Sequence, residues 1–235
     1  MNQHPEKKES GKPRKSPKSE HQIHSYFNLV LLVILTIEWG YLLYDQQWLS
    51  LFLVSLIISS LLAPVLFKNK MDLELPAEFH FMAVLFVFAA LYLGEIQEFY
   101  RLIWWWDIAL HTTAGLMMGI VGFLLVYILN ESKNVELQMS AVFIALFAFM
   151  FAVTIGTIWE IFEFTMDQLF GFNMQKEMLG DPSGLTDTMW DIIVNAFGAL
   201  IICINGWWYL KKRQDFFIRS LIQKFIERNP SWFRR

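Results

Sequence analysis

The sequence predicts an all-α fold: a polytopic membrane helical bundle with six transmembrane helices and both termini in the cytoplasm. Hydrophobic residues make up 55% of the 235 residues, and the mean hydropathy is +0.39, a composition that soluble domains do not show. The apolar residues gather into runs that suit helices crossing about 30 Å of hydrocarbon. The basic residues fall almost entirely on one side of those runs, as the positive-inside rule requires.

The apolar runs give the expected elements in chain order. A short turn around Asp45 joins the first two, so we expect these helices to pack antiparallel. The third run ends near Glu95 and Glu98, and a tryptophan cluster at residues 104–106 precedes the fourth as a predicted interfacial aromatic belt. The fifth helix should continue to Phe170 and be capped by Gly171. The six runs lie at residues 26–44, 48–67, 77–97, 107–129, 138–159 and 189–210.

The charges divide sharply between the two predicted sides of the membrane. Of the 19 Lys and Arg residues, only Arg101 and Lys176 fall outside when the N-terminus is cytoplasmic. The outer side is instead strongly acidic. The acids on or toward it are Glu38, Asp45, Glu95, Glu98, Asp107, Glu160, Glu163, Asp167, Glu177, Asp181, Asp187 and Asp191.

Three regions follow from this topology. We expect a disordered basic cytoplasmic tail at 1–24, a six-helix transmembrane domain at 25–210 and a cytoplasmic amphipathic tail at 211–235. The first span has full membrane length and should remain as an anchor. Residues 215–227 alternate large apolar with basic residues, which predicts an interfacial helix. Cys203 is the single cysteine, so no internal disulfide can form.

Small residues mark one face of the fourth helix. Gly115, Gly119 and Gly122 follow one another at i, i+4 and i+7, a spacing that lets a neighbouring helix approach closely. We interpret this stripe as a packing surface.

The strongest chemical signal lies near the end of the fifth helix. Glu160, Glu163 and Asp167 stand at i, i+3 and i+7 and therefore share one helical face. Carboxylates at a helix C-terminus face the negative end of the dipole and repel one another. A bound cation, protonation or a distant side chain must compensate them, and the sequence favours the first two.

Two acid-containing pairs begin their helices at the same membrane level. Asp107 with His111 and Asp187 with Asp191 are each spaced i, i+4. Asn195 extends the second face one turn deeper, and Glu95 ends the third helix, so four helix ends can converge on one outward-facing pocket. Oxygen-rich ligands with one imidazole suit Mg²⁺, Mn²⁺ or Ca²⁺, and Zn²⁺ or iron less well.

A structural interpretation stands beside each of these residues. Asp107 and Asp187 are acids at helix N-termini, and Thr188 with Asp191 fits a capping box. His111 could be a hydrogen-bonded helix contact that Asp107 orients. Glu38 lies deepest in the first helix, where it either pairs within the bundle or stays protonated.

The predicted site follows from these patterns. Glu160, Glu163 and His111 are the candidates for acid, base or other catalytic roles. The candidate metal ligands are Asp107, His111, Glu160, Glu163, Asp167, Asp187 and Asp191.

These motifs resemble a known family. The segments around Asp107 and His111, around Glu160 and Glu163, and from Gly180 to Asp191 and Gly198 look like the YjdF-type group of small bacterial inner-membrane proteins. A weaker likeness is to the VanZ-like family. The resemblance covers most of residues 26–210 and implies a multi-pass helical protein of the bacterial cytoplasmic membrane. It supplies no established reaction.

Three functions are compatible with these patterns. The first is a metal-dependent enzyme acting on a lipid or cell-envelope precursor at the outer leaflet. The second is a cation- or proton-coupled transporter or sensor in which Glu38, Glu95 and Glu163 titrate. The third is a non-catalytic structural membrane protein. We expect membrane lipids as partners and no nucleic acid, while the sequence leaves the oligomeric state open.

Overall fold

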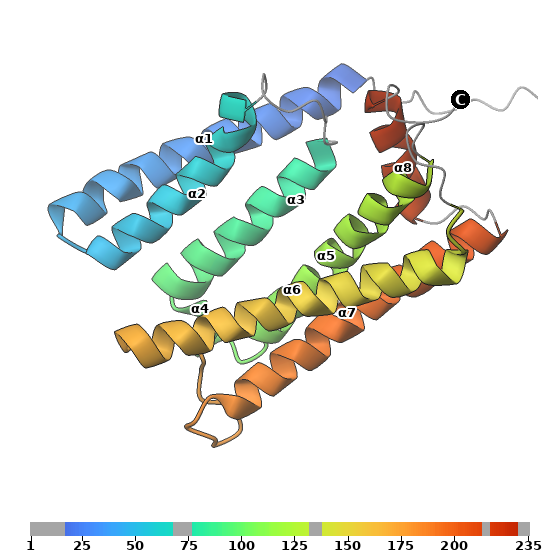
Figure 1. Cartoon of the computed structure of the whole chain (residues 1–235). Helices are drawn as coiled ribbons and strands as arrows, with labels where there is room; N and C mark the ends of the chain where they lie inside the picture. The colour runs from blue at the N-terminus through green and yellow to red at the C-terminus, as the bar shows by residue number, and fades with distance from the viewer. Residues whose placement is uncertain (1–16, 68–76, 132–137, 213–216, 230–235) are drawn as a thin grey trace, which may run out of the picture.

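The computed structural model describes residues 17–67, 77–131, 138–212 and 217–229, and these residues are helical apart from their connecting turns. Figure 1 shows the helices in chain order. They are α1 (Pro17–Tyr44), α2 (Trp48–Phe67), α3 (Ala77–Val87), the π-helix η1 (Phe88–Ile96), α4 (Phe99–Leu102), α5 (Trp106–Glu131), α6 (Ala141–Phe170), α7 (Leu185–Lys212) and α8 (Phe217–Arg228).

The all-helical membrane fold is confirmed for the described residues. Four helical stretches there are long and apolar enough to cross a bilayer: Glu78–Ile96, Trp106–Asn130, Ala141–Phe170 and Leu185–Lys212. The described apolar parts of α1 and α2, Asn28–Tyr44 and Ser50–Leu62, are shorter. The six-span topology and the cytoplasmic position of the termini therefore stay predictions.

Several boundaries differ from the sequence prediction. α1 begins at Pro17, inside the predicted tail, and proline is favoured in the first turn of a helix because its missing N–H needs no partner there. The rest of that tail, residues 1–16, lies outside the described residues. α7 begins at Leu185, four residues earlier than the apolar run, because its first turn is polar and extends above the hydrophobic segment.

The third predicted helix changes its winding near its end. α3 continues into η1, whose last turn is closed by the N–H of Gln97 donating to the carbonyl of Tyr92 at 2.9 Å. This five-residue step is the π-helical pattern, which is often found at functional sites. The Tyr100 ring lies against Gly94, where a Cβ would be 2.4 Å from Tyr100 Cε2. A glycine is therefore required for this contact.

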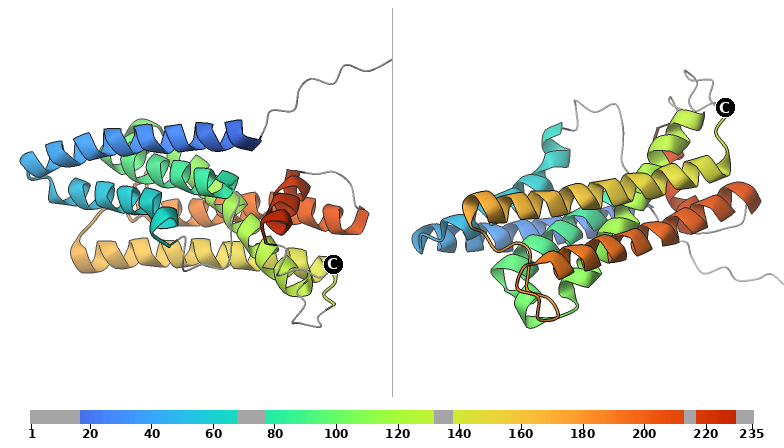
Figure 2. Two further views of the ribbon diagram at one scale, coloured as in Figure 1. Left: turned by 90° about the horizontal axis from the view of Figure 1, so that it is seen from above. Right: turned by 60° about the horizontal axis from the view of Figure 1, so that its bottom comes forward.

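The described helices form two apolar cores rather than one. One core joins α1, α2 and α3, and the other joins α5, α6 and α7 (Figures 1 and 2). The first contains Leu31, Leu35, Leu42, Val54, Ile57, Leu61 and Val84. The second contains Ile120, Phe123, Leu124, Val126, Ile144, Ala145, Ala148, Ile202 and Cys203.

The closest helix contact in the second core joins α5 to α7. A Cβ on Gly115 would lie 2.0 Å from the carbonyl oxygen of Asn195, and a Cβ on Gly198 would lie 2.2 Å from that of Thr112. The backbones of the two helices therefore touch. A Cβ on Gly119 would meet Ile202 at 3.1 Å, and one on Gly122 would meet Phe151 at 2.9 Å. The predicted packing stripe is confirmed, and it serves both α7 and α6.

One end of the bundle collects most of the acidic groups among the described residues, and we call it the acidic end. It contains the C-terminal end of η1, the N-termini of α5 and α7, and the C-terminal end of α6, and it lies toward the lower left in Figure 1. α5 and α7 both start there and run in the same direction, while α6 runs the opposite way. At the other end, α8 lies within the segment predicted to form an interfacial helix, and Lys224 pairs with Glu78 of α3.

We predict that Gly198→Ala destabilises the protein by about 1–3 kcal/mol, because overpacking forces two touching backbones apart. The measurement is thermal unfolding followed by circular dichroism in detergent. Gly40→Ala is the matched control, since no atom lies within 4 Å of the position of its Cβ. Equal melting temperatures for the two variants would contradict the close contact between α5 and α7.

Candidate cation site

The His111 imidazole lies at the centre of a polar cluster at the acidic end. Its Nε2 atom is 3.4 Å from Asp107 Oδ1 on its own helix and 3.9 Å from Asp191 Oδ2 on α7. Its Nδ1 atom is 3.5 Å from Glu160 Oε1 on α6. Three helices that are distant in the sequence therefore bring their polar groups to one imidazole.

The Nε2 side of the ring has the arrangement of a metal site. One ligand atom each from Asp107, His111 and Asp191 lie within 4.8 Å of one another. Ligands on opposite sides of an ion can be about 4–5 Å apart, since bonds to such ions measure about 2.0–2.6 Å. The three atoms are therefore close enough to share one cation.

On the Nδ1 side, a carboxylate lies where it can fix the orientation of the His111 ring. Ligating histidines usually direct their second nitrogen at a carboxylate or carbonyl, which fixes the tautomer and the ring plane. Glu160 occupies that position here. Asp107, to which the sequence interpretation gave an orienting role, lies against the other ring nitrogen, so the two carboxylates contact opposite sides of the imidazole.

Burial of these carboxylates carries a high free-energy cost unless a cation or another partner offsets it. Asp191 is 1% exposed and Glu160 is 3% exposed. Neither carboxylate oxygen of Asp191 has a hydrogen-bond partner among the described residues, while Glu160 has the Thr188 hydroxyl and the His111 imidazole beside it. A buried carboxylate without donors is costly, so such groups are normally paired, protonated or bound to a metal. Asp107 and His111 have side chains 17% and 11% exposed, which leaves a path to the cluster.

The position of Asp191 rules out the predicted capping box. α7 begins at Leu185, so Thr188 is already inside the helix and its N–H donates to the Gly184 carbonyl at 3.1 Å. Asp191 stands almost two turns into the helix, beyond the orphan N–H groups that a cap satisfies. Asp107 and Asp187 do lie in the first turns of α5 and α7, where the helix dipole favours an acid.

The other two acids of α6 are held by different partners. Glu163 is 9% exposed, and its Oε1 accepts a hydrogen bond from the Trp159 indole at 2.8 Å. Asp167 accepts hydrogen bonds from the backbone N–H groups of Met174 at 2.7 Å and Gln175 at 2.9 Å. Asp167 thus fixes the loop that follows Gly171, whose φ of +67° confirms the predicted left-handed cap. Their roles as metal ligands stay predictions.

The loop after α6 folds back over the start of α7. The backbone N–H of Lys176 donates to Asp187 Oδ2 at 2.8 Å, and the Gln175 amide donates to the Thr188 hydroxyl at 2.7 Å. These contacts place Asp187, which is 2% exposed, under the loop rather than among the three atoms around His111 Nε2.

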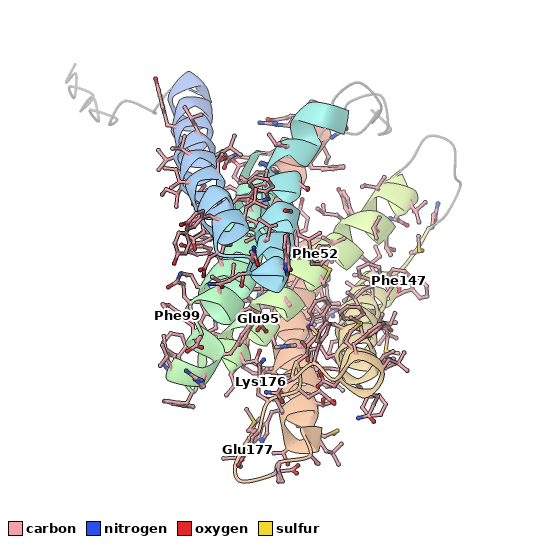
Figure 3. All side chains as sticks on the ribbon, turned by 90° about the vertical axis from the view of Figure 1, so that its left-hand side faces the viewer. Phe52, Glu95, Phe99, Phe147, Lys176 and Glu177 are labelled. Atoms are coloured by element: carbon pink, nitrogen blue, oxygen red, sulfur yellow. The ribbon has the colours of Figure 1, made fainter. Side chains whose placement is uncertain are left out.

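Lys176 does not neutralise the buried cluster. Its ammonium donates to the Asn173 carbonyl at 2.6 Å and lies 3.5 Å from Glu95 Oε1. It also lies 5.6 Å from the centre of the Tyr100 ring. Figure 3 shows Glu95 and Lys176 together at the acidic end, with Glu177 farther out on the loop. Lys176 is one of the two bases that the sequence places on the acidic side, and its charge faces Glu95 in the structure.

Two ionisable groups near the loop have shifted titration for clear reasons. Ser183 and Thr186 donate through hydroxyl and backbone groups to Asp181, and they hold the pKa of that carboxyl well below its usual range. Burial raises the pKa of the Tyr100 phenol, and the charges of Asp107 and Glu95 raise it further. Asp181 therefore stabilises a turn, whereas Tyr100 keeps its proton beside the acidic cluster.

Asn195 forms the floor of the polar region. It is 1% exposed, and its amide donates to the Ala152 carbonyl at 3.2 Å while its Oδ1 has no donor in the described parts of the chain. A Cβ on Gly156 would lie 2.1 Å from Asn195 Nδ2, so this glycine makes room for the amide. The apolar core of α5, α6 and α7 follows below it.

Two residues are placed in ways that the sequence did not indicate. Glu38 is half-buried on α1, on the side of the other apolar core. Trp106 differs from its neighbours: Trp104 is 80% exposed and Trp105 46%, while Trp106 Nε1 is buried and has no acceptor among the described residues. The sequence prediction treated the three tryptophans alike because composition does not show which ring turns inward.

Comparison with known proteins gives the family but no activity. Residues 26–212 match the model of a family described as "Predicted membrane protein (DUF2238)". The chain belongs to this family. One relative of this membrane protein, from Thermotoga maritima, carries the description "Uncharacterized protein" and is 30% identical over 158 residues, which are 67% of this chain and 75% of the relative. No solved structure matches this DUF2238 chain. Membership is consistent with the YjdF-type resemblance, which stays a resemblance.

We predict that Asp167→Ala speeds amide hydrogen exchange at Met174 and Gln175, because their N–H groups lose the acceptor that protects them. Mass spectrometry of the exchanged loop peptides checks this. Glu177→Ala is the control, since Glu177 is exposed on the same loop. Protection that is unchanged in Asp167→Ala would mean that this carboxylate does not anchor the loop.

Proposed function

We propose that this membrane protein binds one divalent cation through Asp107, His111 and Asp191 and uses it to act on a phosphate-bearing lipid or envelope precursor. The site would face the leaflet at the acidic end, which the charge distribution predicts to be the outer leaflet of the bacterial cytoplasmic membrane. Glu160 would orient His111 and remain available for proton transfer.

One observation carries the proposal: the carboxylates of Asp191 and Glu160 are both buried beside His111, and neither oxygen of Asp191 has a hydrogen-bond partner among the described residues. A protonated imidazole could offset only one of these charges. The separations of 3.4–3.9 Å between the imidazole nitrogens and the three carboxylates are also longer than good charge-assisted hydrogen bonds, which measure about 2.7–2.9 Å. A cation between the groups satisfies several oxygens at once.

The donor set favours Mn²⁺ or Zn²⁺ as the first ions to test. Imidazole suits transition metals, while carboxylates suit Mg²⁺, Ca²⁺ and Mn²⁺, so a site with one nitrogen and two oxygens lies between these classes. Mg²⁺ remains a third test because it commonly bridges a few carboxylates to a substrate phosphate.

A bound cation would also supply what the acidic end lacks for phosphate recognition. Arg101 pairs with Glu98, and Lys176 lies against Glu95, so both bases there already face a carboxylate. A metal ion can hold a phosphoryl oxygen, polarise it and stabilise the charge that develops on it. Tyr100 could donate a hydrogen bond to the same oxygen from the side of η1.

The transporter alternative is less well supported. Transport needs a polar route through both leaflets, but the buried polar cluster of α5, α6 and α7 ends at Asn195. The next amide on α7, Asn205, lies ten residues farther along and donates to the Ile201 carbonyl of its own helix. Below Asn195 the described residues form an apolar core that includes Phe123, Ile144 and Ile202. The arrangement resembles a pocket that is closed at its base. A non-catalytic structural role remains the other alternative, and metal binding separates it from the proposal.

We predict that the purified protein binds about one equivalent of Mn²⁺ or Zn²⁺ after chelator treatment, measured by calorimetry and elemental analysis. His111→Ala and Asp191→Asn each remove a ligand and should weaken metal binding at least about tenfold. Glu160→Gln should lower the metal affinity about 10–100-fold, because the His111 imidazole is then less firmly oriented. Glu98→Gln is the matched control, since it removes an exposed carboxylate at the same end.

Metal-dependent change of a lipid head group would show the enzymatic part of the proposal. Phosphorus NMR of defined phospholipid vesicles containing the protein, with and without the bound ion, follows it directly. Wild-type protein without bound metal, or equal binding by all four variants, would refute the cation site. Binding without any change of the phospholipids tested would favour a structural or sensing role.

A further inference from the structure

A groove runs along the surface where the two halves of the bundle meet. Its walls are α3 with η1 on one side and α5 on the other, from Met82 to Ala89 and from Trp106 to Met117. Its volume is about 350 Å³, within the range of about 300–1,000 Å³ that is usual for small-molecule sites. The groove belongs to neither apolar core, because it lies between them.

The groove offers almost no hydrogen-bonding groups along its length. Thr113 is the one residue with a polar side chain in its middle, and its hydroxyl already donates to the Ala109 carbonyl at 2.7 Å. Leu85, which is 45% exposed, stands at its open side. Both walls belong to stretches long enough to cross a bilayer, so the groove opens toward hydrocarbon rather than water.

The length of the groove matches one leaflet. Eleven residue steps separate Trp106 from Met117, which corresponds to about 16 Å of helix, close to half of the roughly 30 Å hydrocarbon thickness. The chain that fits such a groove is an acyl chain of the leaflet at the acidic end. A much longer isoprenoid chain would extend past Met117.

The groove ends at an unsatisfied donor beside the candidate cation site. Trp106 lines the groove, and its indole Nε1 has no acceptor among the described residues. The edge-to-face contact with Phe99, with ring centres 5.0 Å apart, supports the indole from the other side. Buried indole N–H groups normally find a partner. Asp107, a candidate ligand of the cation, is the next residue along α5.

We propose that this groove binds one acyl chain of a glycerophospholipid, and that Trp106 donates its indole N–H to an oxygen of the lipid phosphate. The indole turns toward the groove to make this contact, since the nitrogen is covered in the present conformation. That this lipid is also the substrate rests on the proposed function, because its phosphate would then lie at the level of Asp107 and His111. The lipid site itself does not require the metal.

Photo-cross-linking in nanodiscs tests the groove. The probe is phosphatidic acid with a diazirine near the end of one acyl chain, and mass spectrometry locates the labelled peptides. We expect labelling to concentrate on residues 82–89 and 109–117. Ala109→Trp adds a large side chain to the α5 wall of the groove, and Ala89→Phe adds one to the η1 wall. Each variant should abolish the preferential labelling of residues 82–89 and 109–117. Val142→Trp is the control, because it adds an indole to a position that is 61% exposed on α6.

The role of Trp106 has its own readout. Trp106→Phe keeps the ring and removes the donor, so groove labelling by the phosphatidic acid probe should fall about three- to tenfold, as for the loss of one hydrogen bond. Labelling by a diacylglycerol probe with the same chains should not change, because that lipid has no phosphate to accept the bond. Circular dichroism of each variant confirms that it is folded.

The outcomes separate this inference from the metal proposal. Labelling spread evenly over outward-facing residues of α6 and α7, no effect of either groove-filling variant, or preferred labelling by a polyprenyl phosphate probe would overturn the lipid site. Concentrated labelling of chelator-treated protein that binds neither Mn²⁺ nor Zn²⁺ would support the lipid site and refute the cation site. Metal binding without concentrated labelling would support the cation site and refute the lipid site.

Discussion

The contact between the backbones of α5 and α7 sets the geometry of the acidic end. Gly115 and Gly198 let the two helices touch, and this contact fixes both their separation and their register. The register brings Asp191 to the same level as His111. A side chain at either glycine would push the two backbones apart and move Asp191 away from His111. The packing stripe is therefore a requirement of the site as well as of the fold.

The burial of the cluster gives it chemical meaning. The carboxylates of Asp191 and Glu160 lie close to an imidazole and are buried away from water. An unpaired charge is most costly in such a buried position. The exposed acids differ: Asp181 is satisfied by its own turn, and Glu98 pairs with Arg101. The acidic end thus combines acids that stabilise local structure with a small set that lacks partners.

The sequence predicted the helices well because the bilayer determines their length and the charge of their ends. It also identified His111, Asp191 and Glu160, since polar groups inside apolar segments stand out. It could not give the rotation of each helix about its axis, which decides that Asp191 faces His111 while Asp187 lies under the loop. For the same reason it did not distinguish Trp106 from Trp104 and Trp105.

The parallel course of α5 and α7 has an electrostatic consequence. Two helix N-termini meet at the acidic end, and the dipole of each helix places a partial positive charge of about half a unit there. These dipoles partly offset the potential of the carboxylates, so the region is less repulsive to anions than its formal charge indicates. The first-turn N–H groups of Leu185 and Thr186 already donate to Ser183 and Asp181, so the start of α7 acts on its neighbours through its dipole rather than through free donors.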